Sequence, residues 1–333
     1  MPLSKPDEKR RPKLPIVVSQ GEPSGIGPEV AVKAWSLLNG SVRGRPIQLI
    51  GNADVFLTAA ALSETDAYGL SNAIADIGGT VRAEPGRPSP DNATSVTTAI
   101  ARSVDACRSG AAAAMVTAPI HKSVLTAAGF GFPGHTEYLA SLTQSERAVM
   151  MLASSGVEPP LRVVPFTIHI ALADVFRKLD ANAIAATGAI VLDALQRDFG
   201  CASPRLAIAG LNPHAGEDGT MGREEIEIIA PAVAQLRAQG HDVTGPLSAD
   251  TLFHDEARKT YDAALCMYHD QALIPIKTLA FWTGVNVTLG LPIVRTSPDH
   301  GTALGIAGRG VANPESMIAA IEMAAEIADR RGL

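Results

Sequence analysis

The sequence has few cysteines, no long apolar run and no basic excess, and each absence excludes a class of protein. Three cysteines occur in 333 residues and none forms a CxxC pair, which argues against a disulfide scaffold and fits a reducing compartment. No uncharged apolar stretch approaches the roughly 18 residues of a membrane span. The net charge of −6 provides no global field for nucleic acid or anionic lipid. We therefore expect a cytoplasmic protein with neither a nucleic-acid nor a membrane partner.

The beginning of the chain lacks the pattern of a targeting signal. Residues 1–14 are polar, contain several prolines and carry mixed charge. There is no apolar stretch of the kind a signal peptide needs, and Asp7 and Glu8 count against a transit peptide. We expect residues 1–14 to be a disordered leader.

Beyond the leader, short apolar segments alternate with longer helical patterns. Strands are predicted at 14–19, 47–51, 112–118, 161–170, 205–211, 263–268 and 285–289. Helices are predicted at 92–108, 181–199, 223–239 and 315–329. Strands that are almost continuously apolar are typical of a sheet covered by helices on both faces. The alternation predicts βαβ units and a mostly parallel sheet, which is an α/β fold.

A glycine-rich segment, Gln20 to Glu29, lies between the first predicted strand and a helix. Its glycines would let backbone N–H groups approach an anion at a helix N-terminus. The spacing of Gly21, Gly25 and Gly27 is not the GxGxxG pattern of dinucleotide-binding folds. A tight turn between strand and helix explains this segment equally well.

Three of the eight histidines, His169, His214 and His269, end or interrupt strand-like segments. The carboxyl ends of strands are where open α/β sheets place their ligand crevice. Three neutral imidazoles with an open coordination position would suit Zn²⁺ or a similar divalent ion. Any one of them alone is more simply an ordinary, partly buried histidine.

Two further clusters offer groups that bind anions. His135 and Thr136 stand directly before a helical pattern, where Thr136 would also serve as a helix N-cap. Lys277, Asn286 and Arg295 provide two cations and an amide that could hold phosphate or carboxylate oxygens. For the charged pair, solvated surface positions are the simpler alternative.

Residues 300–314, HGTALGIAGRGVANP, contain four glycines and precede a helix. This stretch resembles the adenosine-binding loop of isocitrate and isopropylmalate dehydrogenases, which bind NAD without a Rossmann fingerprint. From about Ile16 onward the chain closely resembles the 4-hydroxythreonine-4-phosphate dehydrogenase family of vitamin B6 synthesis. The resemblance rests on the segments GEPSGIGPE, TAPIHK, GHTEYLA, LNPHAGEDGTMGREE, GPLSADTLF, MYHDQALIPIK and GVNVTLGLPIVRTSPDHGTA.

The resemblance implies two α/β/α domains with an isopropylmalate dehydrogenase-like fold and an active-site cleft between them. Domain 1, which binds NAD, would combine residues 15–128 and 270–333. Domain 2, residues 129–269, would carry the metal and substrate sites and the dimer contact.

The resemblance also implies the residues of the site. A divalent cation (Zn, Mg or Co) would be held by His169, His214 and His269, the third coming from the partner of a homodimer whose subunits share the active site. Substrate contacts would come from His135, Thr136, Lys277, Asn286 and Arg295. NAD or NADP would contact His300, Gly301, Thr302, Ala303 and Asn313.

The implied reaction is oxidation of 4-phosphooxy-L-threonine at C3, with hydride passing to NAD⁺. The product, 2-amino-3-oxo-4-(phosphooxy)butanoate, is a β-keto acid that decarboxylates to 3-amino-2-oxopropyl phosphate. The proton acceptor is not identified by the sequence, and Lys277, Asp250 and Asp270 are the candidates. Three alternatives stay open: a dehydrogenase of D-threonate or D-erythronate 4-phosphate, a metal-dependent hydrolase, and a noncatalytic module that binds a phosphometabolite.

Overall fold

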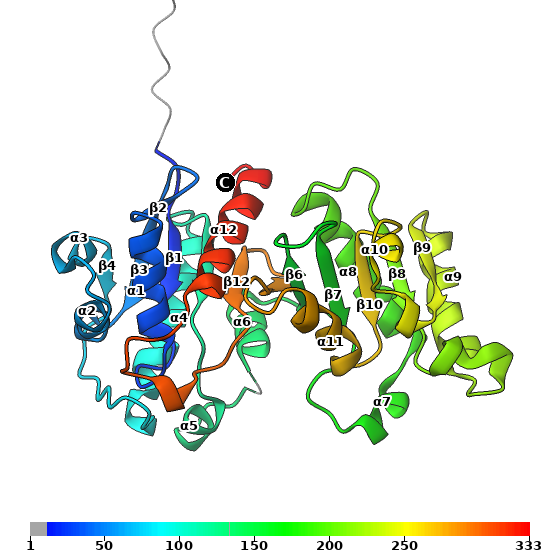
Figure 1. The fold of residues 1–333 in the computed structure, drawn as a ribbon, viewed down its shortest axis with the longest axis horizontal. Helices are drawn as coiled ribbons and strands as arrows, with labels where there is room; N and C mark the ends of the chain where they lie inside the picture. Colours follow the sequence, from blue (N-terminus) through cyan, green and yellow to red (C-terminus); the bar gives the residue numbers. More distant parts are fainter. Residues whose placement is uncertain (1–11, 133) are drawn as a thin grey trace, which may run out of the picture.

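A computed structural model of the chain describes residues 12–132 and 134–333. Most of the leader expected at 1–14 lies outside the described residues. Within them, twelve strands form one sheet (Figure 1). The strands are β1 (Ile16–Ser19), β2 (Ser41–Val42), β3 (Arg45–Gly51), β4 (Ile74–Asp76), β5 (Ala114–Thr117), β6 (Val149–Ser154), β7 (Leu161–Pro165), β8 (Arg205–Ala209), β9 (Asp242–Leu247), β10 (Ala263–Cys266), β11 (Val285–Leu289) and β12 (Arg295–Pro298).

Helices cover both faces of this sheet. They are α1 (Gly27–Leu37), α2 (Ala53–Leu62), α3 (Ala67–Ser71), α4 (Ala93–Arg108), α5 (Lys122–Ala127), α6 (His135–Thr143), α7 (Leu172–Lys178), α8 (Ala181–Arg197), α9 (Ala230–Ala238), α10 (Asp255–Arg258), α11 (His269–Leu279) and α12 (Glu315–Arg330). No helix of the described chain is long and apolar enough to cross a membrane.

The strand order is β2-β3-β1-β5-β12-β11-β6-β7-β10-β8-β9, and β4 pairs with β3. Parallel pairs make up most of each half: β1 lies between β3 and β5, and β10 lies between β7 and β8. Three antiparallel pairings in succession, β12 with β11, β11 with β6 and β6 with β7, join the halves. The predicted α/β class is confirmed.

Side-chain alternation along the strands explains why helices flank both faces. In β1, Ile16 and Val18 are buried on the side of α1 and α12, whereas Val17 is buried on the side of α4. In the second half, Val164 packs toward α8 and α9, and Val163 packs toward α11. All five side chains are at most 1% exposed, as expected for central strands between two helical layers.

The two halves combine distant parts of the sequence. In Figure 1 the blue, cyan and red segments lie in one half and the green and yellow segments in the other. Helix α6 packs on α4, and its Leu139 joins the core of the first half, although it falls within the predicted segment 129–269. Helix α11 packs on β7 and β10, although it falls within the predicted segment 270–333. At both predicted boundaries, the chain therefore passes from one half to the other later than predicted.

Two predicted elements differ from the observed ones for local reasons. The strand predicted over 161–170 ends at Pro165. The helix predicted over 223–239 begins as a π-helical turn, Glu225–Ile229, and becomes α-helical at Ala230. Pro231 has no N–H to donate to the preceding turn, so the regular helical hydrogen-bond pattern is interrupted there.

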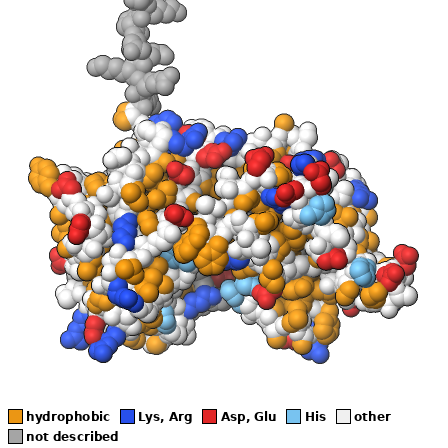
Figure 2. Space-filling model, in the orientation of Figure 1, with side chains coloured by type: hydrophobic (Ala, Val, Ile, Leu, Met, Phe, Trp, Pro, Cys, Tyr) orange, Lys and Arg blue, Asp and Glu red, His pale blue; other side chains and the backbone are white. Residues whose placement is uncertain are grey.

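Both ends of the described chain meet at a buried arginine. Arg45 is 1% exposed, and its guanidinium donates to the Asp329 carboxylate and to the backbone oxygen of Leu333. Asp329 also accepts hydrogen bonds from Lys13 and Arg43, each at 2.9 Å. Burial raises the pKa of Asp329, but these hydrogen bonds outweigh burial and hold it well below its usual range. On the opposite edge of the molecule, a hollow separates the two halves (Figure 2).

Candidate active site

A cavity of about 570 Å³ lies where the two halves meet. Its walls come from the segment after β5, the start of α6, the segment after β7, and strands β11 and β12 with the residues that follow. Figure 2 shows histidine and basic side chains gathered in this hollow. The lining residues are Thr117, Pro119, Ile120, Lys122, Gly134, His135, Thr136, Glu137, Met150, Ile168, His169, Asn286, Arg295, Ser297, Pro298, Asp299, His300 and Gly301.

Arg295, the first residue of β12, is the buried cation of this cavity. Its side chain is 2% exposed, and its hydrogen-bond partners within the described chain are two hydroxyl groups. Nε and Nη2 donate to Oγ1 of Thr117, the former at 3.1 Å, and Nη1 donates to Oγ1 of Thr288 at 2.8 Å. Burial lowers the pKa of Arg295 to about 9, which leaves it a cation at neutral pH. Because hydroxyl groups orient a guanidinium without neutralising it, the cavity attracts an anion.

His135 and Thr136 lie at the N-terminal end of α6, which faces the cavity. Gly134, not Thr136, is the N-cap, so the alternative role proposed for Thr136 is wrong. Burial, followed by the charges of Arg295 and Lys122, lowers the pKa of His135 far below its usual value, and the ring is neutral at pH 7. Its buried Nε2 has no hydrogen-bond partner within the described chain. Unpaired helix N–H groups, a neutral imidazole and a buried guanidinium together form a surface for anion oxygens.

Asn286 lines the cavity directly, whereas Lys277 contacts one of its lining residues. Asn286 on β11 lines it, and its buried Oδ1 lacks a partner among residues 12–132 and 134–333. Lys277 on α11 does not line it, but its Nζ lies 2.6 Å from Oδ2 of the lining residue Asp299. Four of the five predicted substrate contacts therefore line one cavity, and the fifth reaches it through Asp299.

His169 and His269 are neighbours within the chain, with ring centroids 5.7 Å apart. Both line a smaller cavity of about 280 Å³, and His169 also lines the larger one. Burial, Lys122 and His269 lower the pKa of His169, which favours the neutral imidazole that binds metal ions. Across residues 12–132 and 134–333, however, no three His, Cys, Asp or Glu side chains come together as a metal site.

His214 occupies an unusual backbone segment after β8. Residues 214–218 all have positive φ, between 39° and 79°. Such left-handed residues cost roughly 1–2 kcal/mol each when they are not glycine. The turn is held by Glu225, 3% exposed, whose Oε1 accepts from the backbone N–H groups of Leu211 and Asn212. Its Oε2 accepts from the Asn212 side chain, so one buried carboxylate fixes the segment that presents the exposed His214.

The other two candidate proton acceptors, Asp250 and Asp270, also lie outside the lining of the large cavity. Asp250 is exposed and accepts a hydrogen bond from Ser248, which holds its pKa below the usual value. Asp270 is 70% exposed and contacts Nδ1 of His269 at 2.7 Å. The structure therefore places Asp270 next to a candidate metal ligand and Asp250 near His214.

The predicted cofactor loop is tied to the first half. His300 and Gly301 line the large cavity, and the buried Nε2 of His300 is without a partner among the described residues. The Thr302 carbonyl accepts from the N–H of Ile26, and Ala303 is left-handed with φ of 42°. Asn313 is further along, where its side chain accepts the N–H of Glu315 at the start of α12. The first part of the loop thus meets the cavity, and Asn313 anchors the following helix.

Lys122, Thr117 and Asp299 line the cavity but were not among the predicted site residues. Lys122 and Thr117 belong to the quoted segment TAPIHK and Asp299 to TSPDHGTA. The sequence signal was therefore present in the motifs, but a motif does not show which of its side chains face inward.

A family model and individual proteins match this chain over most of its length. The family described as "Pyridoxal phosphate biosynthetic protein PdxA" matches residues 44–324. A 4-hydroxythreonine-4-phosphate dehydrogenase of Paracoccus denitrificans is 53% identical over 95% of this chain and 98% of its own length.

Solved structures agree with this similarity. The crystal structure of 4-hydroxythreonine-4-phosphate dehydrogenase from Klebsiella pneumoniae superposes with a TM-score of 0.82 at 38% identity, covering 95% of this chain and all of that one. A terephthalate 1,2-cis-dihydrodiol dehydrogenase from Burkholderia xenovorans has a TM-score of 0.63 at 29% identity, covering 94% and 97% of the two chains.

Proposed function

Because the chain belongs to the PdxA family of pyridoxal phosphate biosynthetic proteins, we propose that it oxidises 4-phosphooxy-L-threonine at C3 with NAD or NADP as hydride acceptor. The product, 2-amino-3-oxo-4-(phosphooxy)butanoate, then decarboxylates to 3-amino-2-oxopropyl phosphate. This assigns the protein to pyridoxine (vitamin B6) biosynthesis, in the cytoplasm.

The observation that carries the proposal is Arg295, a buried guanidinium oriented by hydroxyl groups and facing a cavity. The unpartnered Nε2 of His135 and Oδ1 of Asn286 face the same space. A phosphate or carboxylate of the substrate satisfies Arg295 and an N–H at His135 Nε2, because each anion supplies several strong acceptor oxygens. Arg295, His135 and Thr136 hold this anionic end, and Oδ1 of Asn286 accepts from a donor such as the hydroxyl or ammonium group of the substrate.

The donor set also fits a divalent cation in part. His169 and His269 supply two neighbouring imidazoles, and the pKa of His169 keeps that ring in the ligating form at neutral pH. A bound Zn²⁺, Mg²⁺ or Co²⁺ would stabilise the alkoxide of the reacting hydroxyl. The prediction took His269 from the partner subunit, but His169 and His269 are neighbours in one chain and no third ligating side chain joins them among the described residues. We therefore assign the partner's contribution to His214, in a proposed homodimer with shared active sites.

The nicotinamide cofactor is assigned to the loop after β12. His300 and Gly301 line the cavity, and Thr302 and Ala303 continue the loop along the β1–α1 segment through the contact with Ile26. Backbone groups and the unpartnered His300 Nε2 provide polar contacts there.

A substrate panel tests the reaction. With NAD⁺, NADH formation is compared for 4-phosphooxy-L-threonine, D-threonate 4-phosphate, D-erythronate 4-phosphate and 4-hydroxy-L-threonine without phosphate. The proposal expects the first to have the highest kcat/KM and the unphosphorylated compound the lowest. A preference for either sugar-acid phosphate would assign the protein to that dehydrogenase activity instead.

Mixed dimers test the shared site. Because His169 and His269 are neighbours in one chain, mixing His214→Ala with His169→Ala subunits restores one intact set per dimer. Mixing His169→Ala with His269→Ala is the matched control, which restores none. Recovery in the control mixture instead would show that the two neighbouring rings serve different sites.

A further inference from the structure

Two carboxylate side chains line the large cavity, Glu137 and Asp299. Glu137 is exposed at the start of α6, whereas the side chain of Asp299 is 16% exposed. Asp250 and Asp270 are not among the lining residues. Asp299 is therefore the more sheltered of the two carboxylates that line this cavity.

Asp299 and Lys277 form a fixed pair. Lys277 Nζ lies 2.6 Å from Asp299 Oδ2 and also donates to the Asp299 backbone carbonyl. The Asp299 N–H donates to Oγ of Ser316 at 3.1 Å, and that hydroxyl donates to the Gly284 carbonyl. The ring of Phe281 lies 5.4 Å from the Lys277 ammonium. The Lys277 ammonium therefore contacts both the carboxylate and the carbonyl of Asp299, and the Asp299 backbone is fixed by its bond to Ser316.

We propose that Asp299 and Lys277 form the proton-accepting pair of the reaction, in which Asp299, which lines the cavity, receives the proton and Lys277 positions its carboxylate. This inference rests on the proposed dehydrogenase function. As the C3–H bond breaks, its hydrogen and electron pair pass to C4 of the nicotinamide. The O–H bond breaks as C=O forms, and its proton passes to the carboxylate of Asp299. The alcohol and NAD⁺ thus become ketone and NADH, and one proton remains on Asp299 before release to water.

The electrostatics of the pair agree with this direction of transfer. Burial raises the pKa of Asp299, against the opposing effects of Lys277, His300 and His269. A carboxyl group with a raised pKa accepts a proton at less cost than an exposed aspartate does.

The test is the pH dependence of kcat in Asp299→Asn, with Asp193→Asn as the matched control. Asp193 is 65% exposed and pairs with Arg197, which is itself 40% exposed. In the wild-type protein the rate should fall as the pH drops through the pKa of the acceptor. Asp299→Asn should lose this acidic limb and reduce kcat by about 100-fold or more, with KM changed only a few-fold. Asp299→Glu keeps the carboxyl group and should recover part of kcat together with the limb.

Three outcomes decide the proposal. Wild-type kcat and an unchanged acidic limb in Asp299→Asn would overturn it while leaving the dehydrogenase function intact. A wild-type protein that reduces no NAD⁺ with any substrate of the panel would overturn both. If Asp299→Asn does not fold, Lys277→Met replaces it: without the ammonium that lowers the pKa of Asp299, the acidic limb should move to higher pH, and an unmoved limb would overturn the proposal.

Discussion

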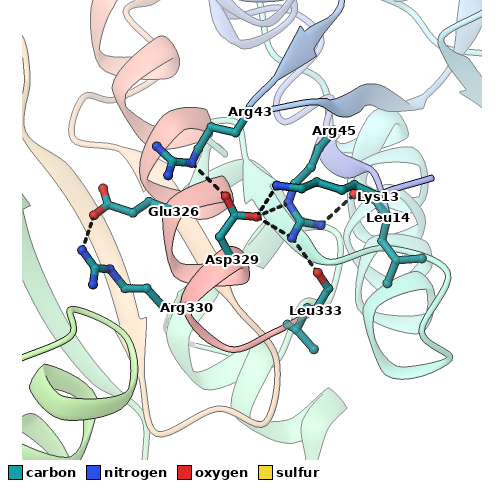
Figure 3. A network of polar contacts seen from close by, with 8 residues as sticks. All are labelled: Lys13, Leu14, Arg43, Arg45, Glu326, Asp329, Arg330 and Leu333. Carbon is teal, nitrogen blue, oxygen red and sulfur yellow. Dashed lines mark hydrogen bonds and ion pairs between the residues drawn. The ribbon is translucent and has the colours of Figure 1, made fainter. Parts of the chain in front are cut away.

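Replacing Asp329, on helix α12, by asparagine should destabilise the protein, because it leaves the buried charge of Arg45 on strand β3 without its carboxylate partner. Figure 3 shows Arg43, Arg45 and Lys13 converging on this carboxylate. Removing one partner of a buried ion pair costs about 3–5 kcal/mol, because the other charge stays buried without compensation. Arg45 is 1% exposed, but Asp329 is 23% exposed and Arg45 retains two backbone acceptors. The lower end, about 3 kcal/mol, is therefore expected.

Thermal unfolding measures this loss. At about 2 °C per kcal/mol for a chain of this size, the midpoint of Asp329→Asn should fall by about 6 °C at neutral pH. Asp193→Asn is the matched control, since Asp193 is 65% exposed and pairs with Arg197 on the surface. Its midpoint should stay within about 1 °C.

The pH dependence separates the charge from the side-chain shape. The pKa of Asp329 is lowered in the folded state, so its contribution is full at neutral pH and is lost as pH falls through that lowered pKa. The difference between wild type and Asp329→Asn should therefore persist down to about pH 4, where a free aspartate titrates, and shrink below it. A variant with wild-type midpoint at neutral pH would refute the reasoning.

Three further predictions concern the cavity. Thr117→Val should raise the KM for the substrate by about 10-fold or more, because it removes an acceptor that orients the Arg295 guanidinium. Thr117→Ser keeps the hydroxyl group, so its KM should stay near that of the wild type. Equal KM values for both variants would contradict this. Because burial lowers the pKa of His135, only the unfolded chain binds a proton at this residue below about pH 6.5. The thermal stability of the wild type should therefore fall on acidification relative to that of His135→Gln. Parallel plots of unfolding midpoint against pH for the two proteins would argue against this. Removal of divalent metal with a chelator should abolish turnover and added Zn²⁺, Mg²⁺ or Co²⁺ should restore it; full activity in verified metal-free protein would exclude the metal's role.

The sequence predicted best those elements whose own residues determine them. Strand 285–289 and the helix from Ala93 to Arg108 agree closely with the structure, because alternation of apolar and polar residues and a Gly stop are local signals. Strand β12, RTSP, was not predicted, since its four residues are polar or proline and owe their conformation to neighbouring strands. Tertiary pairing overrode local propensity there.

The residues of the candidate site were likewise predicted only in part. Motif resemblance identified His135, Asn286 and Arg295, which the structure brings to one cavity. It did not identify Asp299, whose importance depends on a contact across 22 residues with Lys277. The left-handed turn at residues 214–218 was equally hidden, because four of its five residues are not glycine and the carboxylate that holds the preceding residues, Glu225, follows later in the sequence.

The continuous sheet has a mechanical consequence for the cavity. The halves are joined by hydrogen-bonded strands, β12, β11 and β6, and not by linkers alone. Closing the cleft around a substrate must therefore twist this ribbon of three paired strands. The stiffness of the ribbon limits how far the two halves move and returns the cleft to its open width. Arg295 and Asn286 sit on that ribbon itself, so its elastic deformation would reach the gripping side chains directly.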